Sequence, residues 1–392
     1  MRNRRPRLAA IVVLATALTH VAAAHATDPG PYVALGDSYT AAPLVLNQVG
    51  QPAGCARSDH NYPSLVRTAT AAARFRDVSC SAATTQDLTA PQPVILGTNP
   101  PQLDALTADT GLVTLGIGGN DVGLVTVAVK CVQLGLLAPT GTACRDSSAM
   151  SGGGDRLVDE IAETAPKIAA TLQNIHARAP QARVLVVGYP DVAPRDGRGC
   201  YPLVPLSPDD IAYLDEMLRR TNTMLAEQAA ANDAEYVDTY EESAGHDVCT
   251  PPGTRWFEGL IPTAPAFPIH PNALGEASMA RSVLRVLGQP RPAAMLGPLR
   301  RSQRTITAGR ALHVSYSASR PTSVTFGLQC SRGRGRYMAA RALPAANAAA
   351  GENVVTLSAK QLGRRAGLYR LTAAAVPGGA VQLVGFRIRR AR

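Results

Sequence analysis

Apolar runs alternate with amphipathic stretches over most of the chain. Four short apolar runs predict buried strands at residues 32–35, 111–117, 183–188 and 235–238. Between and after them, apolar residues at helical spacing predict helices over 58–75, 155–179, 207–232 and 271–287. Ser207 ahead of Pro208 is typical of a helix start. Strands that alternate with helices predict an α/β fold, in which helices cover both faces of a parallel sheet.

The last hundred residues follow a different pattern. Short runs rich in β-branched and aromatic residues predict strands at 312–317, 323–328, 354–357, 369–372 and 381–386. Turn residues separate these runs, and no helical spacing of comparable length is present. We therefore expect a small β-sandwich-like domain at the C-terminal end, attached to the larger α/β part.

The charge of the chain divides at the same place. The whole sequence has 39 Lys+Arg and 29 Asp+Glu, a formal net charge of +10. Residues 291–392 hold 18 of the basic residues and a single acid, Glu352. Four more arginines lie in the first seven residues, which leaves 17 basic residues against 28 acids in 27–290. With Pro290, Pro292 and Pro298 around the break, we place a boundary between an acidic domain, 27–290, and a basic domain, 291–392.

The first 26 residues have the pattern of a secretory signal peptide. Arg2, Arg4, Arg5 and Arg7 precede an apolar stretch over 8–24, and Ala24-His25-Ala26 supplies an A-x-A cleavage site. The alternative is a membrane anchor, but the stretch is shorter than the roughly 20 residues that a spanning helix needs. We expect residues 1–26 to be removed and the protein to be secreted or associated with the cell envelope.

The cysteine content suits an exported protein. Six of the seven cysteines can pair outside the cytoplasm, and one is left over. They lie at Cys55, Cys80, Cys131, Cys144, Cys200, Cys249 and Cys330. No C-x-x-C pair is present and histidine is sparse, which argues against a structural zinc site. Pairing of nearest neighbours would leave Cys330 unpaired, but the sequence alone does not determine the connectivity.

Three polar residues follow predicted strands or begin a predicted helix. Ser38 comes after the first strand, Asn120 follows Gly118-Gly119 after the second, and His270 begins the last helix. A serine hydroxyl becomes a useful nucleophile only when a base takes its proton, and acyl transfer needs donors for the developing oxyanion. Each residue alone is a common turn or cap residue, but the set predicts a serine hydrolase. The G-x-S-x-G motif of α/β-hydrolases is absent.

These motifs resemble those of a known superfamily. Gly36-Asp37-Ser38-Tyr39, residues 118–121 and His270-Pro271-Asn272 resemble blocks I, III and V of the SGNH (GDSL) hydrolases. Further stretches resemble the secreted actinobacterial lipases and esterases of that superfamily. They are Asn61-Tyr62-Pro63, Cys80-Ser81, Gly188-Tyr189-Pro190, 245–249 and Arg255-Trp256. The resemblance implies a flavodoxin-like three-layer α/β/α fold with no metal and no organic cofactor.

The resemblance also implies roles for individual residues. Ser38 would be the nucleophile and His270 the general base. The oxyanion hole would consist of the Ser38 amide, a block II amide and the Asn120 side chain. The relatives have three consecutive disulfides, which favours the nearest-neighbour pairs. These pairs are Cys55–Cys80, Cys131–Cys144 and Cys200–Cys249.

Two positions depart from the family pattern. Ala82 stands where block II usually has glycine. Its amide remains a donor, but a positive φ there would cost an alanine on the order of 1 kcal/mol, so we expect reduced activity or a slightly shifted loop. The triad acid is also missing, because Phe267 occupies the position three residues before His270. We expect the Phe267 carbonyl to accept the His270 Nδ1–H, with Asp247 as the alternative acceptor.

The resulting hypothesis is a secreted carboxylic ester hydrolase, an esterase or lipase, that is a monomer. Phospholipase and carbohydrate O-deacetylase activity are the alternatives, as is an envelope-binding protein with an inactive hydrolase body.

The basic domain has three interpretations: a solvated surface, docking against the acidic domain, or binding to an anionic cell-envelope surface, which we favour. No nucleic-acid recognition motif is present and aromatic residues are few, so we expect no nucleic-acid partner. Asp37 and Asp121 are expected to hold turns.

Overall fold

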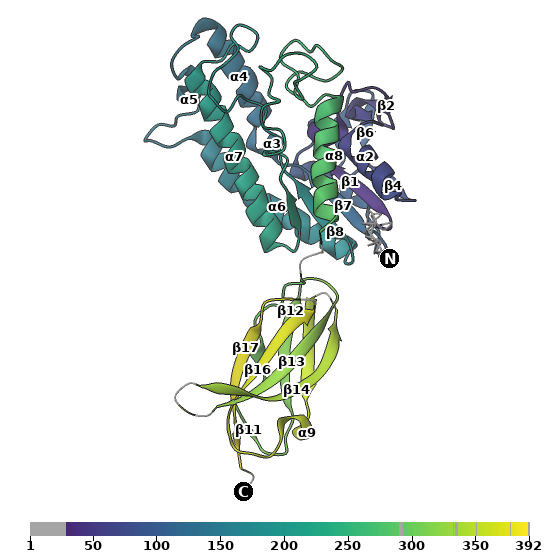
Figure 1. Cartoon of the computed structure of the whole chain (residues 1–392), viewed down its shortest axis with the longest axis vertical. Coiled ribbons are helices and arrows are strands. Elements are labelled where there is room, and N and C mark those ends of the chain that lie inside the picture. The colour runs from purple at the N-terminus through teal and green to yellow at the C-terminus, as the bar shows by residue number, and fades with distance from the viewer. Residues whose placement is uncertain are drawn as a thin grey trace, which may run out of the picture.

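The computed structural model describes residues 29–289, 293–331, 333, 336–349, 351–376 and 378–390. The predicted signal peptide therefore lies outside the described residues, as do Pro290 and Pro292. Figure 1 shows two parts, a larger one in which helices surround a sheet and a smaller one built of strands. Among the described residues, no helix combines the length and the apolar character that crossing a membrane requires.

A five-stranded parallel sheet forms the centre of the larger part, with the strand order β4-β1-β7-β8-β9. The strands are β1 (Tyr32–Gly36), β4 (Phe75–Asp77), β7 (Leu112–Gly116), β8 (Arg183–Val187) and β9 (Glu235–Val237). The sequence predicted all of them except β4. That edge strand was wrongly joined to a predicted helix over 58–75, which ends earlier because Ala71 adopts the left-handed conformation.

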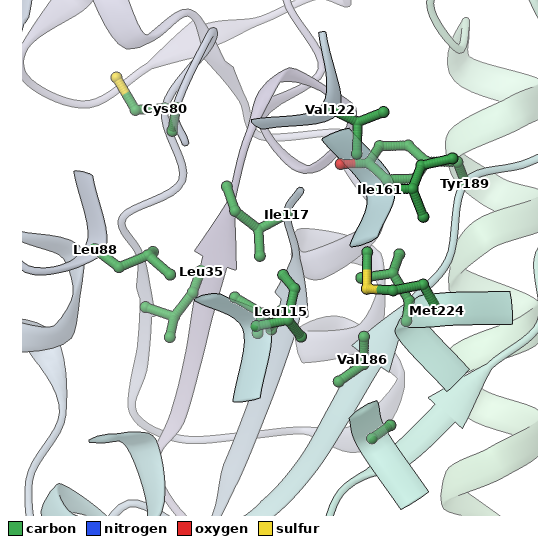
Figure 2. Packing of buried hydrophobic residues seen from close by; sticks show 14 of the residues in the cluster. Leu35, Cys80, Leu88, Leu115, Ile117, Val122, Ile161, Val186, Tyr189 and Met224 are labelled. Atoms are coloured by element: carbon green, nitrogen blue, oxygen red, sulfur yellow. The ribbon is translucent and has the colours of Figure 1, made fainter. Parts of the chain in front are cut away.

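Two pairs of helices cover the two faces of this sheet. Side chains of α2 (Tyr62–Thr70) and α8 (Ala273–Leu287) pack with Ala34 and Leu112 on one face. On the other face, α6 (Arg156–Arg178) and α7 (Pro208–Ala231) pack with Leu35 and Leu115. Figure 2 shows this second core, where Leu115 and Val186 of the sheet lie beside Met224 of α7. Successive strand residues face opposite layers, so the three-layer α/β/α fold is confirmed.

Short elements follow the carboxyl ends of the strands. They include α1 (Ser38–Ala41) after β1 and α3 (Gly119–Val122) after β7. Two further helices, α4 (Leu124–Leu137) and α5 (Ala143–Asp146), were not predicted from the sequence. The remaining elements are β2 (Gln48–Val49), β3 (Arg57–Ser58), β5 (Gln92–Val94), β6 (Gly97–Asn99) and the 3₁₀ turns Ala53–Cys55, Thr85–Leu88 and Gln102–Ala105.

Three disulfides join neighbouring cysteines along the chain. They are Cys55–Cys80, Cys131–Cys144 and Cys200–Cys249, as the nearest-neighbour pairing predicted, and Cys330 is a free thiol. The first links two loops beside β1, the second joins α4 to α5, and the third joins the loops before α7 and after β9. All three lie in the part of the chain that carries the predicted catalytic residues.

The C-terminal part consists of two sheets that enclose one apolar core, as expected for a sandwich. The first sheet has the order β10-β12-β15 and the second β11-β17-β16-β13-β14. Their strands are β10 (Arg300–Arg301), β11 (Thr305–Thr307), β12 (Leu312–Ala318), β13 (Thr322–Ser331), β14 (Tyr337–Ala348), β15 (Gly351–Leu357), β16 (Gly367–Val376) and β17 (Gln382–Arg389), with helix α9 (Ala359–Leu362) between β15 and β16. The alanine-rich β14 was missed because alanine has low strand propensity.

One buried ion pair connects the two parts. Arg320, in the turn between β12 and β13, pairs with Asp233, and both side chains are at most 10% exposed. Asp233 lies just before β9, at the amino ends of the parallel strands. The β part therefore contacts the end of the sheet opposite to the one where Ser38 and Asn120 lie (Figure 1).

Candidate active site

Ser38 is presented by a tight turn at the end of β1. Asp37 caps α1, and its Oδ1 accepts the Tyr39 N–H at 2.9 Å. Gly36, which ends β1, has φ +154°, and a Cβ there would lie 2.5 Å from the Gly116 carbonyl oxygen and 2.3 Å from Thr40 Oγ1. Glycine is therefore needed for the chain to turn beside β7. As the first residue of α1, Ser38 has a main-chain N–H with no acceptor among the described residues.

His270 approaches Ser38 from the far end of the sequence. Its Nε2 lies 2.8 Å from Ser38 Oγ, and the two side chains are largely buried. The His270 Nδ1 lies 2.8 Å from the main-chain carbonyl oxygen of Pro268. A carbonyl can only accept, so Nδ1 carries the hydrogen and Nε2 is left to accept the Ser38 hydroxyl proton.

The predicted acceptor for Nδ1 was wrong by one residue. The Phe267 carbonyl accepts the main-chain N–H of His270 at 3.1 Å instead, which closes a turn over residues 267–270. Within this turn, Ile269 has φ +60°, and the Pro268 carbonyl is the one directed to the imidazole. The alternative acceptor, Asp247, is also wrong, because its Oδ1 accepts the Cys249 N–H and the Pro268 carbonyl occupies Nδ1.

A buried carboxylate holds the His270 segment in place. Glu258 exchanges main-chain hydrogen bonds with Ile269 and His270, both at 3.0 Å. Its side chain accepts from Asn272 Nδ2 at 2.8 Å and from Thr263. Burial alone would raise the pKa of Glu258, but the hydrogen bonds from Asn272 and Thr263 outweigh it and lower the pKa below its usual value. Sequence reasoning missed this residue, since no motif marks an isolated glutamate.

Asn120 stands at the start of α3 with its side-chain amide held in place. Its Nδ2 donates to the Ala83 carbonyl at 2.8 Å, and the residue lines the same cavity as Ser38 and His270. Gly118 before it has φ +112°, a conformation that side chains rarely adopt. The Nδ2 atom carries a second hydrogen, which has no acceptor among the described residues.

Ala82 adopts the conformation that favours glycine. Its φ is +65°, which costs an alanine on the order of 1 kcal/mol. The loop is held on both sides, because the Cys80 N–H donates to Gly36 at 3.0 Å and the Ala83 N–H donates to Cys80 at 3.1 Å. The Ala82 N–H has no acceptor among the described residues. The structure thus brings the three predicted oxyanion donors to loops at one edge of the sheet.

A hydrogen-bonded chain joins the serine turn to the asparagine turn. The Gly119 N–H donates to Tyr189 Oη at 2.7 Å, and the Tyr189 hydroxyl donates to Asp37 Oδ2 at 2.5 Å. Burial raises the pKa of Asp37 to about 7, although the hydrogen bonds from Tyr189 and Tyr39 oppose that rise. Asp121 accepts the Thr85 N–H at 2.9 Å. The turn-holding role predicted for Asp37 is confirmed. Asp121 also bonds a main-chain amide, but that of Thr85 in a distant 3₁₀ turn, so it joins two segments, and the link through Tyr189 was not foreseen.

The pH dependence of activity should follow His270. Burial lowers its pKa below 6.5, and the Pro268 carbonyl, which favours the charged ring, only partly opposes this. The base must be neutral to accept a proton, so we expect the acid limb of kcat/KM to have its midpoint below pH 6.5. A pH profile measures this, with Asp37→Asn as the control because Asp37 also titrates near neutrality. A limb centred above 6.5 in both proteins would contradict the assignment to His270.

An apolar cavity of about 230 Å³ opens beside Ser38 and His270. Part of its wall comes from α4 and α7, which lie side by side (Figure 1), and the rest from the loops after β8 and β9 and the turns around the serine and the histidine. The residues from the two helices include Leu124, Ala128, Val132, Ile211, Leu214 and Leu218. Few polar groups line the cavity near the serine, and Asn120 and Asp37 are among them. A cavity of this composition accommodates a hydrocarbon group better than a sugar.

A serine bonded to a buried histidine at the carboxyl edge of a parallel sheet is the arrangement of a serine hydrolase. The chain belongs to the GDSL-like lipase/acylhydrolase family, whose model matches residues 34–277. The resemblance predicted from the motifs is thereby confirmed, and the chain is a carboxylic ester hydrolase.

Two lipases and a phospholipase are among the proteins to which this chain is similar. Lipase 2 of Streptomyces coelicolor is 41% identical over 290 residues, which cover 72% of this chain and 95% of that lipase. Lipase 1 of the same organism is 30% identical over 271 residues, which cover 68% of this chain and 91% of that one. The crystal structure of phospholipase A1 from Streptomyces albidoflavus has a TM-score of 0.54 at 27% identity, covering 66% of this chain and 99% of the phospholipase.

Proposed function

We propose that the chain hydrolyses esters of apolar acyl groups through an acyl-enzyme on Ser38. The observation that carries this proposal is the 2.8 Å contact between His270 Nε2 and Ser38 Oγ at the wall of an apolar cavity. The acyl chain would lie between α4 and α7, with its carbonyl carbon at Ser38. The wall is mostly apolar, so it excludes water from that chain and offers few partners to sugar hydroxyls.

In the first half of the reaction, Ser38 Oγ attacks the ester carbonyl carbon while its proton passes to His270 Nε2. The oxyanion that forms faces the N–H groups of Ser38 and Ala82 and the free hydrogen of Asn120 Nδ2. The tetrahedral intermediate then collapses, and His270 returns the proton to the departing alkoxide. The Pro268 carbonyl stabilises the positively charged imidazole through Nδ1–H, which is the role that a carboxylate has in a full triad.

In the second half, water replaces the alcohol. His270 takes a proton from that water as its oxygen attacks the acyl carbon, and the bond between Ser38 Oγ and the acyl carbon breaks. The carboxylic acid leaves and Ser38 regains its proton. Phe267, which lines the cavity and packs edge-on against His270 with ring centroids 5.3 Å apart, would shield the imidazole on one side.

Narrowing the cavity should change the preference for acyl length. Ala128 lies on the cavity wall in α4, and Ala128→Phe would fill space that only a long acyl chain needs. We expect kcat/KM for a dodecanoyl ester to fall about tenfold or more, which corresponds to the loss of a few methylene contacts, while acetyl ester hydrolysis stays within about twofold. Thr126→Phe is the matched control, since Thr126 is exposed on the same helix and does not line the cavity. Equal losses on both esters would argue against an acyl site here.

Phospholipids are a second candidate substrate, because a phospholipase A1 shares the fold and 27% of its sequence with this chain. Both candidates use the same serine and the same cavity, and they differ in the group that leaves. Hydrolysis of phosphatidylcholine vesicles, compared with hydrolysis of triacylglycerol of the same acyl length, distinguishes them. A preference for acetylated sugars over both would point to a carbohydrate O-deacetylase.

We propose further that the protein is exported after cleavage behind Ala26 and has two domains, 27–290 and 291–392. Three disulfides and separate apolar cores in the two parts support this arrangement. The net charge of the C-terminal domain supports retention at an anionic surface of the cell envelope.

Sequencing the N-terminus of the mature protein tests the cleavage. Cell fractionation with and without residues 291–392 tests the retention, and unchanged binding after the deletion would rule it out.

A further inference from the structure

Arginines gather at one end of the larger C-terminal sheet. The start of β16 and the end of β17 meet there, because Gly367 pairs with Ile388 and Leu368 with Arg387. We call the arginines at this end the distal arginine cluster. It consists of Arg364, Arg365, Arg370, Arg387, Arg389 and Arg390.

The cluster is free to meet a partner. All of its members are exposed except Arg370, which is half-buried over the ring of Tyr337 at 4.0 Å. None of them forms an ion pair with an acid in the part of the chain that the structure describes. Glu352, the single acid of residues 291–392, lies in the other sheet of the sandwich, on β15. No acidic side chain among the described residues of this domain therefore pairs with the six positive charges.

The spacing of the cluster is regular. Arg387 and Arg389 alternate with the buried Ile388 on β17, so their side chains leave the same face of the sheet about 7 Å apart along the strand. Arg370 on β16 pairs with Gly385 and lies diagonally beside Arg387 on that face. Arg364 and Arg365 lie in the loop that leads into β16. The three strand arginines thus follow a diagonal line across one face, which suits a linear chain better than a point ligand.

The cluster and the active site lie at opposite ends of the molecule. Arg320, which pairs with Asp233 of the larger part, lies just before β13, whose first residues pair with the far end of β16 at Val376. Six residues along β16 lead from Arg370 of the cluster to Val376, a distance of roughly 20 Å. Figure 1 shows β11, which pairs with Arg387 and Arg389 of β17, at the end of the molecule away from the larger part. The serine lies further still, beyond the carboxyl ends of the central sheet.

We propose that the distal arginine cluster binds a linear polymer of phosphate charges, and that the cavity of the bound enzyme faces away from that polymer. This inference rests on the retention proposed above and names its surface and its partner. Guanidinium groups bond phosphate oxygens in pairs, so a row of them follows a phosphodiester chain closely. Among the described residues, Tyr369 and Phe386 beside the row are buried and Tyr337 is covered by Arg370, so these rings offer no open platform for stacking bases or sugars. The cluster also lacks the exposed Trp or Phe that anchors proteins in a bilayer surface.

The test measures binding of the mature full-length protein to labelled long-chain polyphosphate between 50 and 200 mM salt. The variant Arg370→Gln/Arg387→Gln/Arg389→Gln removes three charges of the row. We expect its dissociation constant to rise about tenfold or more, and the slope of log Kd against log salt to flatten by about 2, since each lost phosphate contact is worth about 0.7. The control Arg67→Gln/Arg145→Gln/Arg156→Gln removes three exposed arginines of the catalytic part and should bind as the wild type does.

Vesicles containing phosphatidylglycerol form the second arm of this experiment. Tighter binding to vesicles than to polyphosphate at equal phosphate would overturn the proposal in favour of a membrane surface. Equal weakening by both triple variants, or no binding to polyphosphate, would also overturn it. Saturating polyphosphate should leave kcat/KM for a short soluble ester within twofold, whereas a large drop would place the polymer across the cavity. Ser38→Ala should bind polyphosphate normally, so failure of binding and failure of catalysis are distinguishable.

Discussion

Ser38→Ala should lower kcat for ester hydrolysis by at least about 10⁴-fold. The substitution removes the only oxygen within hydrogen-bonding distance of His270 Nε2 among the described residues, so no acyl-enzyme can form. Serine hydrolases lose about 10⁴ to 10⁶ in kcat when the nucleophile is removed, and the remainder comes from binding and the oxyanion hole. Turnover of a chromogenic ester, with protein purified in parallel, measures this.

The double variant makes the prediction sharper. Because Ser38 and His270 act in one proton transfer, Ser38→Ala/His270→Ala should be no slower than Ser38→Ala alone, to within about threefold. Ser64→Ala, a serine on α2 that does not line the cavity, is the control and should keep full activity. Thermal unfolding of each variant shows whether the fold is intact. If Ser38→Ala retained more than about 1% of the activity in a folded protein, the nucleophile would have to be another group.

Asn120→Ala should lower kcat about 10²- to 10³-fold and leave KM within a few-fold. In the proposed mechanism the amide of Asn120, which lines the cavity, donates to the developing oxyanion, so its loss raises the transition state more than the bound ground state. Full kinetics on one soluble ester separate kcat from KM. The result would establish a side-chain donor in the oxyanion hole.

A structural role for Asn120 would look different. Its Nδ2 also holds the Ala83 carbonyl, and losing that bond alone would lower the melting temperature and raise KM through a displaced loop. Asn174→Ala on α6 is the matched control, since Asn174 is half-buried, does not line the cavity and makes a similar bond to a main-chain carbonyl. An unchanged kcat with a raised KM would contradict the oxyanion role.

The places of the candidate catalytic residues in the fold could be predicted because they depend on local sequence. A buried strand that ends in glycine and a polar turn places Ser38 at the carboxyl edge of the sheet, and the same logic applies to Asn120 behind β7. Parallel strands bring their carboxyl ends to one edge, so the two residues had to be neighbours. His270 was predicted by the resemblance and by its place at the start of a helix.

The partner of His270 could not be predicted in the same way. The dihedral angles of residues 267–270 determine which carbonyl reaches Nδ1. An isoleucine in the sequence does not indicate the positive φ that Ile269 adopts there. Glu258 supports the His270 segment from a loop that carries no motif. The hydrogen bond between Asp37 and Tyr189 joins residues more than a hundred positions apart in the sequence. Such contacts depend on how the layers pack, which a pattern of apolar positions does not describe.

For this protein, the sequence by itself determined the two-part architecture and the basic character of the C-terminal part. It also indicated Ser38, Asn120 and His270 as the candidate catalytic residues and the strands or helix that each of them follows or begins. These follow from periodicity, charge and motif, which are properties of short segments. Only the tertiary structure decided that Pro268 supplies the carbonyl at Nδ1, that α4, α7 and the loops around the serine enclose an apolar cavity, and that arginines of β16 and β17 gather at the end remote from that cavity. These depend on the register and packing of distant segments, because hydrogen bonds and van der Waals contacts act over a few ångströms in space and not along the chain.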